Sequence, residues 1–434
     1  MFKPTAARTS RLYWSRWQGS CSVQHRLARL AALASLACVA IMLSSTAASA
    51  VLPRQECLSI SDYSGIGDGT TDNTTPLNTA IAALPSYGGC IAFPAGKYKF
   101  NSALSYTPSP TIYSLTLIGA GANNTTLYWP GTNGITFNAH GYDQSIHVRD
   151  LTFSTGDTTG SYIGLTLTNS TADGINFLSD IVRTSFRGDD NGPQPSGTKY
   201  WGIGVETIGH SNINFDSDDF FGPTTPAGSG IYLSGNPSGT GNKYGVVYNI
   251  AKCGFWFTGN GIIIGDFVQG VSITQSNFTN GTTGIWLKPQ VVTSTFAELA
   301  ITGGNQFNTK GYQILLQQPV NQLIMNGNLI YVANGLAGIY FDSPSSLPPG
   351  IQNTIVNNAI GAVPPHNSNT TGILVGGANS PVVVTGNVFQ YLTTGVDLTG
   401  TSGWNVQANR YDSVTTHVAN IGSPGANSVG VATD

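Results

Sequence analysis

Acidic side chains concentrate in one segment of the chain, between Asp173 and Asp219. Eight of the 21 aspartates and glutamates lie within this segment. Carboxylates that are held close together repel one another, so such a cluster needs cations, a bound proton or a function. Asp is also a common turn residue, and a set of solvated loop acids is therefore the alternative interpretation. The eight acids are Asp173, Asp180, Asp189, Asp190, Glu206, Asp216, Asp218 and Asp219.

The spacing within this segment points to acid–base chemistry. Asp189 and Asp190 are adjacent in the stretch RGDDNG, and His210 follows 20 residues after Asp190. Two carboxyl groups can divide the roles of proton donor and proton acceptor between them, and a nearby imidazole can orient or tune them. The candidates for contacts to a substrate are Arg187, Trp201 and Lys243.

The stretch FDSDDFFGP offers a second kind of chemistry. Asp216 and Asp218 are two residues apart, so their side chains share a face if the segment is extended. Their hard carboxylate oxygens are the ligand type that Ca²⁺ prefers. We expect no cofactor, unless Asp216 and Asp218 together hold a Ca²⁺ ion. A simple loop or coil corner is the alternative.

The composition predicts the elements that must position these groups. Only 9% of the residues are charged, which disfavours the exposed faces of amphipathic helices. The 54 glycines, together with many Ser, Thr and Asn and scattered Val and Ile, are typical of an all-β chain with many turns.

A loose repeat runs through the chain from about residue 160. A short apolar strand ends in Asn and a second short strand follows, as in VSITQSNFTNGTTGIWL and VVVTGNVFQYLTTGVDL. The Asn falls at positions 277, 305, 328, 357, 387 and 409, in steps of 28, 23, 29, 30 and 22 residues. A strand-built repeat of this length predicts a solenoid, whose coils bury alternate apolar residues against one another. A β-sandwich is the structural alternative.

The predicted solenoid places the candidate residues. An Asn at one corner of each coil tolerates a left-handed backbone and can bond to the Asn of the neighbouring coils. If one coil takes a little over 20 residues, Asp189 and Asp190 lie one coil away from His210 on the same outward face. Trp201, Trp256 and Trp286 are candidates for stacking on a ligand, although most aromatic residues are expected in the interior.

Residues 1–50 differ in composition from the rest of the chain. They contain six Lys or Arg and no acid, then an apolar run from Leu30 to Leu43, and they end in Ala48-Ser49-Ala50, which has the form of a cleavage site. We predict an export signal that is cut after Ala50, and a secreted, periplasmic or cell-surface protein. A retained membrane anchor is the alternative.

Removal of the signal leaves 12 basic residues against 21 acids, a net charge near −9. This charge disfavours nucleic acids and anionic membranes as partners.

The start of the remaining chain, residues 51–100, is expected to form a cap and the first coil of a domain that spans residues 51–434. Thr75 before Pro76 suits an N-cap, and Leu77, Ala80, Ile81 and Leu84 share a helix face that can close the open end of the solenoid. If Cys57 and Cys90 lie on neighbouring strands in register, they can form a disulfide. Cys253 is then left over, buried or free.

The segment that is expected to form the cap and the first coil also resembles a known family. DYSGIGDGTTDNTTPLNTAIAAL followed by GGCIAFPAGKY resembles the N-terminal signature of pectate-lyase-like, right-handed parallel β-helix proteins. The resemblance implies a single β-helix with a carbohydrate-binding groove along one face. It identifies a fold rather than a reaction, because related chains include hydrolases, lyases, epimerase-like proteins and phage tail-spike depolymerases.

A second, partial resemblance concerns the reaction. Gly188-Asp189-Asp190 and Gly209-His210-Ser211 are similar in order and spacing to two motifs of polygalacturonase-type glycoside hydrolases. The resemblance implies an inverting hydrolysis of a pectin-like glycan, in which one aspartate protonates the leaving oxygen and the other activates a water molecule. The family's Asn-Thr-Asp and Arg-Ile-Lys motifs are absent. A Ca²⁺-dependent polysaccharide lyase and a non-catalytic carbohydrate-binding surface protein are the rival hypotheses.

Overall fold

The computed structural model of the chain describes residues 57–434 apart from several short segments. Residues 1–56, which include the predicted export signal, lie outside the described residues. Residues Glu56–Asp434 form one compact unit, to which the following description applies. The internal and terminal segments that are also outside the description are residues 109–113, 142, 171–175, 192–196, 237–243, 289–295, 334, 343–352, 364–368, 377–380, 423–426 and 431–434.

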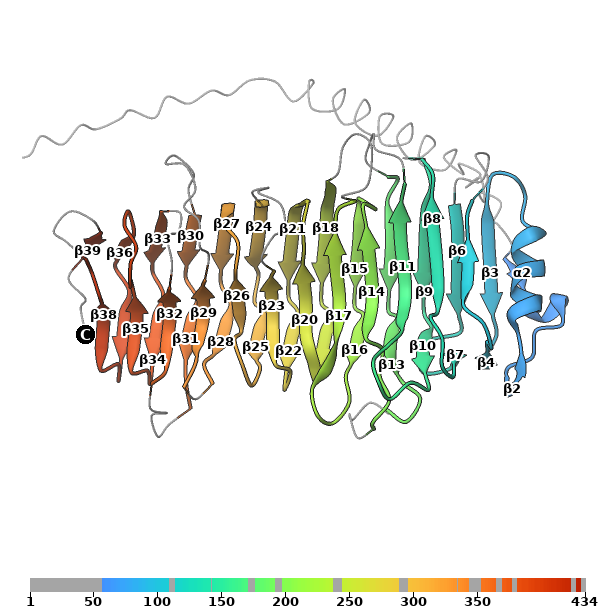
Figure 1. The fold of residues 1–434 in the computed structure, drawn as a ribbon, viewed down its shortest axis with the longest axis horizontal. Coiled ribbons are helices and arrows are strands. Elements are labelled where there is room, and N and C mark those ends of the chain that lie inside the picture. Colours follow the sequence, from blue (N-terminus) through green and yellow to red (C-terminus); the bar gives the residue numbers. More distant parts are fainter. Residues whose placement is uncertain are drawn as a thin grey trace, which may run out of the picture. The chain divides into compact units, whose positions relative to one another are not determined.

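Three long sheets of parallel strands make up this unit (Figure 1). From β3 onward, successive strands go to sheets A, B and C in turn, and each strand pairs with the strand three positions later in the chain. At the start of the stack β1 pairs with β3 and β2 with β4. In sheet A, for example, β12 pairs with β9 on one side and with β15 on the other. The predicted all-β solenoid is confirmed, and the arrangement is consistent with a right-handed parallel β-helix.

Within each sheet the strands follow one another in chain order. Sheet A contains β1 (Leu58–Ser59), β3 (Gly89–Phe93), β6 (Ser114–Gly119), β9 (Ser145–Arg149), β12 (Ser179–Val182), β15 (Ile213–Asp216), β18 (Gly245–Ala251), β21 (Val268–Thr274), β24 (Phe296–Thr302), β27 (Val320–Asn326), β30 (Asn353–Val356), β33 (Val382–Thr385), β36 (Asn405–Gln407) and β39 (Ser428–Val429). Sheet B contains β2 (Asp68–Asp72), β4 (Gly96–Lys99), β7 (Thr125–Trp129), β10 (Thr152–Thr155), β13 (Ser185–Gly188), β16 (Asp219–Phe221), β19 (Gly254–Trp256), β22 (Asn277–Thr279), β25 (Gln306–Asn308), β28 (Leu329–Tyr331), β31 (Ala359–Gly361), β34 (Val388–Gln390) and β37 (Arg410–Asp412). Sheet C contains β5 (Leu104–Tyr106), β8 (Ile135–Ala139), β11 (Ile163–Asn169), β14 (Ile203–Ile208), β17 (Ala227–Ser234), β20 (Thr258–Ile264), β23 (Thr283–Leu287), β26 (Ile314–Leu316), β29 (Ala337–Phe341), β32 (Thr371–Val375), β35 (Thr394–Asp397) and β38 (Thr416–Ala419).

Sheet B contributes a column of stacked phenylalanine rings to the interior. Successive ring centroids lie 4.6 to 5.1 Å apart, which follows from the spacing of neighbouring strands. Sheet C provides room for the column with glycines: a Cβ on Gly230 would lie 2.6 Å from Phe255, and one on Gly261 would lie 2.5 Å from Phe278. The column consists of Phe153, Phe186, Phe220, Phe255, Phe278 and Phe307.

The turn from sheet A to sheet B has two residues in most coils. The first has a left-handed backbone, as at Asn357 (φ 55°), and the second points inward and bonds to the same position of the next coil. We call this inward position the corner ladder. In its C-terminal half, the backbone N–H of each ladder Asn donates to the side-chain oxygen of the next, at 2.9 to 3.0 Å. The ladder residues from Thr184 onward are Thr184, Asp218, Cys253, Ser276, Asn305, Asn328, Asn358, Asn387 and Asn409.

The predicted Asn corner is therefore confirmed, with two positions corrected by one residue. Asn305, Asn328, Asn387 and Asn409 occupy the ladder. In the other two coils Ser276 and Asn358 take the inward position, and the neighbouring Asn does not. Asn357 is the left-handed residue before the ladder position, a conformation that also suits Asn, whereas Asn277 is the first residue of β22 and follows the ladder residue Ser276.

The N-terminal end of the stack contains the one α-helix of the described residues, α2 (Thr74–Ala82), and a short 3₁₀ helix, η1 (Ile60–Tyr63). Helix α2 lies beside β2 and β3 in Figure 1 and buries Leu77 and Ala80 in the common core. The helix begins two residues earlier than predicted: Asn73, not Thr75, occupies the N-cap position, and the Asp72 carboxylate accepts the N–H of Thr74 at 3.0 Å.

The predicted Cys57–Cys90 disulfide is present. It joins neighbouring strands of sheet A, since Leu58 of β1 pairs with Ile91 of β3. Cys253 is buried and free, at a position of the corner ladder. None of the helices in the described residues has the length and apolar character needed to cross a membrane.

Candidate functional site

The structure does not bring the three predicted catalytic residues together. Asp189 follows β13 at the start of the connection from sheet B to sheet C, and its carboxylate pairs with Lys97 and, at 3.8 Å, with Lys199. Asp190, although adjacent, turns into this connection and accepts the N–H groups of Thr198 and Lys199 at 2.8 and 3.1 Å. The two carboxylates therefore have separate partners.

The hydrogen bonds of Asp190 give it a structural role. Burial raises the pKa of Asp190, but the N–H donors of Thr198 and Lys199 outweigh burial and lower the pKa below its ordinary value. A carboxyl group with a lowered pKa and with its oxygens in use is a poor general acid. We assign Asp190 to the folding of its own loop.

His210 lies in the interior and not on the outward face. Its side chain is fully buried between sheets C and A, with Nε2 2.9 Å from the Ser179 hydroxyl. Burial lowers the pKa of His210 to about 4, so the imidazole is neutral. The coil between Asp190 and His210 is lengthened by the connection that Asp190 organises. His210 therefore lies at the corner between sheets C and A, whereas the two aspartates lie at the corner between sheets B and C.

The predicted substrate contacts have three different outcomes. Trp201 is a core residue, 4% exposed, whose indole N–H donates to the carbonyl of Phe153 at 3.1 Å, so it does not stack on a ligand. Arg187 lies on the outer face of sheet B, because its neighbour Phe186 points into the core. Lys243 falls outside the described residues.

The predicted calcium ligands also separate. Asp216 ends β15 and is exposed, 3.5 Å from the ammonium group of Lys252, whereas Asp218 is fully buried in the corner ladder. The left-handed residue Ser217 between them reverses the alternation that the prediction assumed. Among the residues that the structure describes, no group of three His, Cys, Asp or Glu side chains is placed to hold a metal ion.

A row of outward side chains on sheet C has the character of a binding face. Strand register aligns Glu206, Tyr232, Ile263, Trp286, Leu315 and Tyr340 across six neighbouring strands. The three aromatic residues recur on every second strand, so they are about 10 Å apart, a distance that about two sugar rings span. Flat apolar rings with a polar edge suit the stacking of sugars. We call this row, with Asp266, Lys288, Gln317 and Asp342 beside it, the C-face.

Titratable groups with shifted pKa values gather at one end of the C-face. Burial raises the pKa of Glu206, which makes no hydrogen bond within the described residues. Burial, followed by the charges of Glu206 and Asp266, raises the pKa of the neighbouring Tyr232. One carboxylate oxygen of Asp266 is buried and has no hydrogen-bond partner in the described structure. Such perturbed, unpaired groups are typical of reactive sites.

Local backbone geometry sets the position of Tyr232. Its ring leans towards the next coil, where a Cβ added to Gly265 would lie 3.1 Å from the phenol oxygen. The glycine thus leaves the space that brings the phenol next to Asp266. The ammonium group of Lys288, one coil further on, lies 5.8 Å from the centre of the Tyr232 ring. The phenol is therefore surrounded by two carboxyl groups and one cation.

The other end of the C-face is a fixed polar network. The indole of Trp286 donates to Gln317 at 2.8 Å, and the Gln317 amide donates to Asp342 at 2.9 Å. The hydroxyl of Tyr340 donates to the second oxygen of Asp342 at 3.2 Å. Tyr312 packs against Tyr340 with ring centroids 5.2 Å apart. These bonds hold the aromatic side chains in place before any ligand arrives.

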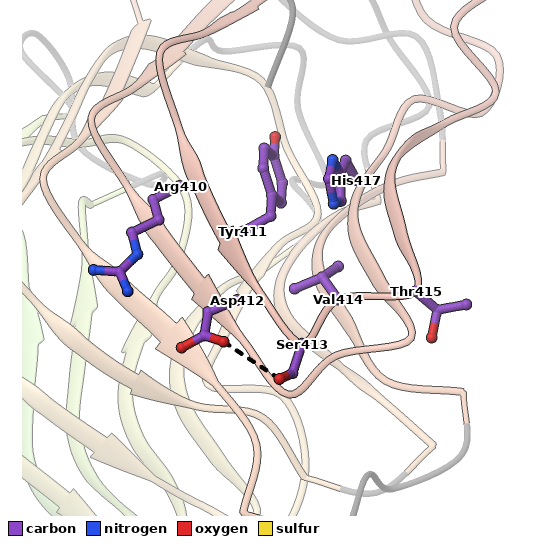
Figure 2. Close-up of a pocket in the computed structure, with 7 residues that line it drawn as sticks. All are labelled: Arg410, Tyr411, Asp412, Ser413, Val414, Thr415 and His417. Atoms are coloured by element: carbon purple, nitrogen blue, oxygen red, sulfur yellow. Dashed lines mark hydrogen bonds between the residues drawn. The ribbon is translucent and has the colours of Figure 1, made fainter. Parts of the chain in front are cut away.

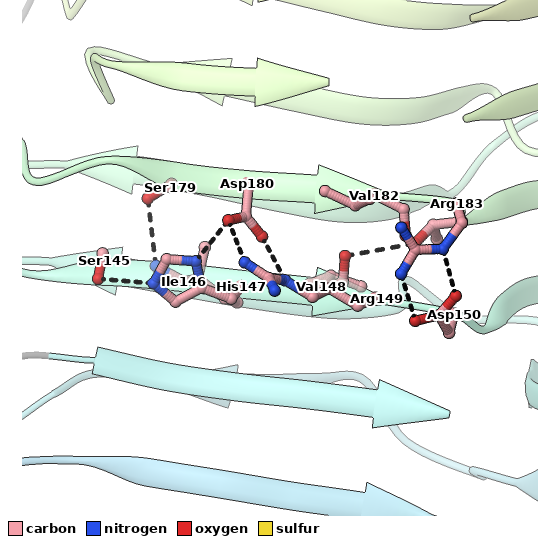
Figure 3. Close-up of polar contacts among 11 residues, drawn as sticks. Ser145, Ile146, His147, Val148, Arg149, Asp150, Ser179, Asp180, Val182 and Arg183 are labelled. Carbon is pink, nitrogen blue, oxygen red and sulfur yellow. Dashed lines mark hydrogen bonds and ion pairs between the residues drawn. The ribbon is translucent and has the colours of Figure 1, made fainter. Parts of the chain in front are cut away.

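In a polar cluster on sheet A, a Ser, a His and an Asp side chain contact one another in a row (Figure 3). The Ser145 hydroxyl lies 3.3 Å from Nε2 of His147, and Nδ1 of His147 lies 3.0 Å from the Asp180 carboxylate. Arg149 also pairs with Asp180 through two bonds of 2.9 and 2.6 Å. Ser145 is only 4% exposed, so it is not open to a substrate. We assign this cluster to the stability of sheet A.

Asp180→Asn should lower stability at pH 7 by about 1–2 kcal/mol, because Arg149 and His147 lose their charged partner. Burial raises the pKa of Asp180, but His147 and Arg149 outweigh it and lower the pKa to about 2. The group therefore stabilises the fold above pH 3.8, and this contribution is lost as the pH falls towards 2. Melting temperatures at pH 7 and pH 2.5 test the prediction. An equal loss at both values would contradict it.

Asp150→Asn provides a control for that experiment. Asp150 pairs with Arg183 at 2.6 and 2.7 Å, but the Arg183 side chain is 57% exposed. An exposed pair of this kind contributes about 0.5 kcal/mol. The melting temperature should change much less than in Asp180→Asn.

A cavity of about 620 Å³ lies at the last coils, between β37 and β38 (Figure 2). Tyr411 and His417 stack in it with ring centroids 4.4 Å apart. Its one carboxylate, Asp412, accepts hydrogen bonds from Ser413 and Gln390 at both oxygens. The cavity therefore holds no free acid or base, and we do not place a reaction there.

Solved structures with this architecture include several carbohydrate-related proteins. The chain is similar to the A-module of the mannuronan C-5 epimerase AlgE4 of Azotobacter vinelandii, with 16% identity and a TM-score of 0.55 over 87% of this chain and 100% of that chain. It is similar to the Dettilon tailspike protein, with 14% identity and a TM-score of 0.59 over 87% and 68% of the two chains. It is also similar to the catalytic domain of a GH87 α-1,3-glucanase in complex with nigerose, with 12% identity and a TM-score of 0.53 over 87% and 68%. No protein-family profile matches the chain, and no curated protein does so either. At these identities the similarities establish the parallel β-helix fold.

Proposed function

We propose that this protein binds a polysaccharide along the C-face and hydrolyses a glycosidic bond there. The observation that carries the proposal is Glu206, a half-buried carboxyl group with a raised pKa and no hydrogen-bond partner in the described structure, at the end of an aromatic row. A raised pKa lets a carboxyl group keep its proton to higher pH, which favours its use as a general acid. The names of the similar structures, an α-1,3-glucanase and a mannuronan epimerase, agree with a glycan as the substrate.

In this proposal Glu206 is the acid and Asp266 the base. Glu206 donates its proton to the glycosidic oxygen as the bond from that oxygen to the anomeric carbon breaks. Asp266 accepts a proton from a water molecule, whose oxygen forms the new bond to the anomeric carbon. Both carboxyl groups lie near the phenol of Tyr232, since the charges of both raise its pKa. An inverting hydrolase holds its two carboxyl groups about 6.5–9.5 Å apart, which admits a water molecule between them and the sugar.

Neighbouring side chains support these roles. The raised pKa of Tyr232 keeps its phenol protonated, so that it can donate a hydrogen bond to a sugar hydroxyl. Trp286 and Tyr340 provide the surface on which the remaining sugar rings lie. Asp189, Asp190 and His210 receive no catalytic role, because they do not meet in one groove. The Cys57–Cys90 disulfide supports a location outside the cytoplasm.

A screen of the protein against a panel of neutral and acidic polysaccharides tests the proposal. We expect new reducing ends without ultraviolet absorbance. Products that absorb in the ultraviolet would show a double bond and would replace hydrolysis by an elimination, as in a lyase. Binding to a glycan with neither product would identify a non-catalytic binding protein and would also overturn the proposal.

A further inference from the structure

Three cations surround one carboxylate on the outer side of sheet B. The ammonium group of Lys97 pairs with Asp189 and lies 4.1 Å from the centre of the Tyr128 ring. Lys199 lies 3.8 Å from the second oxygen of Asp189. Arg187 is two residues before Asp189 on the same strand end. The chain has only 18 Lys and Arg in 434 residues, so three of them around a single acid are a marked concentration.

Arg187 is the unusual member of this group. It is partly buried, and burial lowers the pKa of its guanidinium group although the charge of Asp189 acts in the opposite direction. Within the described residues it makes neither a hydrogen bond nor an ion pair. Removing a guanidinium from water without a partner is unfavourable, whereas pairing it with a carboxylate through two parallel bonds is a strong interaction. Within the described residues no anion pairs with Arg187, and a ligand can supply one.

The face next to Arg187 suits a sugar chain. Phe220 pairs with Phe186, so Phe221 lies beside Arg187 on the next strand, and it stacks on Trp256 with ring centroids 6.5 Å apart. The row continues through the aligned residues Thr279 and Asn308. It reaches an open hollow of about 350 Å³, which is lined by Asn308, Tyr331 and Gln390 among others. We call this row, from Arg187 to Tyr331, the B-face.

We propose that the B-face is a second glycan-binding site, which recognises an acidic polysaccharide through a uronate carboxylate at Arg187. The sugar ring that carries this carboxylate lies on Phe221 and Trp256, and the following rings lie along Thr279 and Asn308. The site is independent of the reaction on the C-face, since its residues come from a different sheet.

Three carboxylates lie close to this site, and each is already engaged. Asp189 neutralises Lys97, and Asp190 is held by its loop N–H groups. Asp219 accepts the indole N–H of Trp256 at 3.0 Å, and burial raises its pKa, which reduces its charge at mildly acidic pH. Arg187 therefore stays available to a ligand.

Binding of oligogalacturonate, measured by titration calorimetry at low salt, tests the proposal. Arg187→Gln should weaken binding at least tenfold, because the carboxylate loses its two-bond partner. Arg183→Gln is the matched control: Arg183 is exposed and paired with Asp150 on the neighbouring corner, and its replacement should leave binding unchanged. Fully methyl-esterified oligogalacturonate, which has the same rings without charge, should bind as weakly to the wild type as the acid does to Arg187→Gln.

Two further variants separate this proposal from the proposed reaction. Asp189→Asn removes the competing carboxylate and should tighten binding. Glu206→Gln should bind oligogalacturonate at the B-face as well as the wild type does, even if the protein cleaves no glycan. A folded Arg187→Gln variant with unchanged affinity, or equal binding of acid and ester, would overturn the proposal. Binding of a sulfated glycan but not of oligogalacturonate would overturn the assignment to a carboxylate.

Discussion

Glu206→Gln should lower the rate of glycan hydrolysis by about 10²–10⁴-fold and should at the same time make the protein more stable at neutral pH. The loss of activity follows because the amide cannot donate a proton to the leaving oxygen. The gain in stability follows because burial raises the pKa of Glu206, which makes its ionised form unfavourable in the folded state. A residue whose replacement improves the fold but removes the activity is expected at a reactive site.

The pH dependence of the stability gain has a defined sign. The pKa of Glu206 is raised on folding, so the wild type is most stable below the ordinary pKa of 4.5 and loses stability as the pH rises through the folded-state pKa. The amide does not titrate. The difference in melting temperature between Glu206→Gln and the wild type should therefore be small at pH 4 and larger at pH 8.

Glu298→Gln is the matched control for this experiment. The substitution is chemically the same as Glu206→Gln, but Glu298 is exposed on β24 of sheet A, away from the C-face. Its replacement should change neither the rate of hydrolysis nor the melting temperature by more than the error of measurement. Hydrolysis that survives in Glu206→Gln, or that is lost equally in Glu298→Gln, would remove Glu206 from the mechanism.

The sequence predicted the fold because the signals for the fold recur in every coil. Strand alternation, the corner Asn and the cysteine pair each depend on local spacing, and each is found in the structure. The corner position is shifted by one residue at 277 and 357, and the helix N-cap lies two residues before Thr75. A shift of one residue matters little to a solenoid whose coils are similar. It matters much to a site, because neighbouring residues of a strand point to opposite sides.

The candidate site could not be predicted in the same way. The expectation that Asp190 and His210 lie one coil apart assumed a coil of a little over 20 residues, whereas Phe186 and Phe220, which are aligned on neighbouring coils, are 34 residues apart. Asp190 organises a long connection in this coil, and His210 turns inward. A usable signal was present elsewhere. The pattern Gly-Val/Ile-x recurs at the strands of sheet C, where Gly faces the aromatic column and x points outward. The residues at position x of this pattern include Glu206, Tyr232, Trp286 and Tyr340.

Asp218→Asn should stabilise the fold by about 3 kcal/mol at pH 8, which is the second large effect we expect. Asp218 stands in the corner ladder, where later coils have Asn, and its Oδ1 accepts the N–H of Thr184 at 2.8 Å as a ladder Asn would. Its Oδ2 is buried without a hydrogen-bond partner. In Asn358 the corresponding amide group donates to the carbonyls of Val356 and Met325 at 2.9 and 3.2 Å. An amide at position 218 can make the equivalent bonds.

The effect should grow as the pH rises, because burial raises the pKa of Asp218 well above its ordinary value. The wild type therefore loses stability between pH 3.8 and the folded-state pKa, while the Asn variant does not. Melting temperatures at pH 4 and pH 8 measure the difference. Asp216→Asn is the control, since Asp216 is exposed and its pairing with Lys252 contributes little. A destabilised Asp218→Asn, or a gain that is the same at both pH values, would show that the carboxyl group has a role in the ladder that an amide cannot fill.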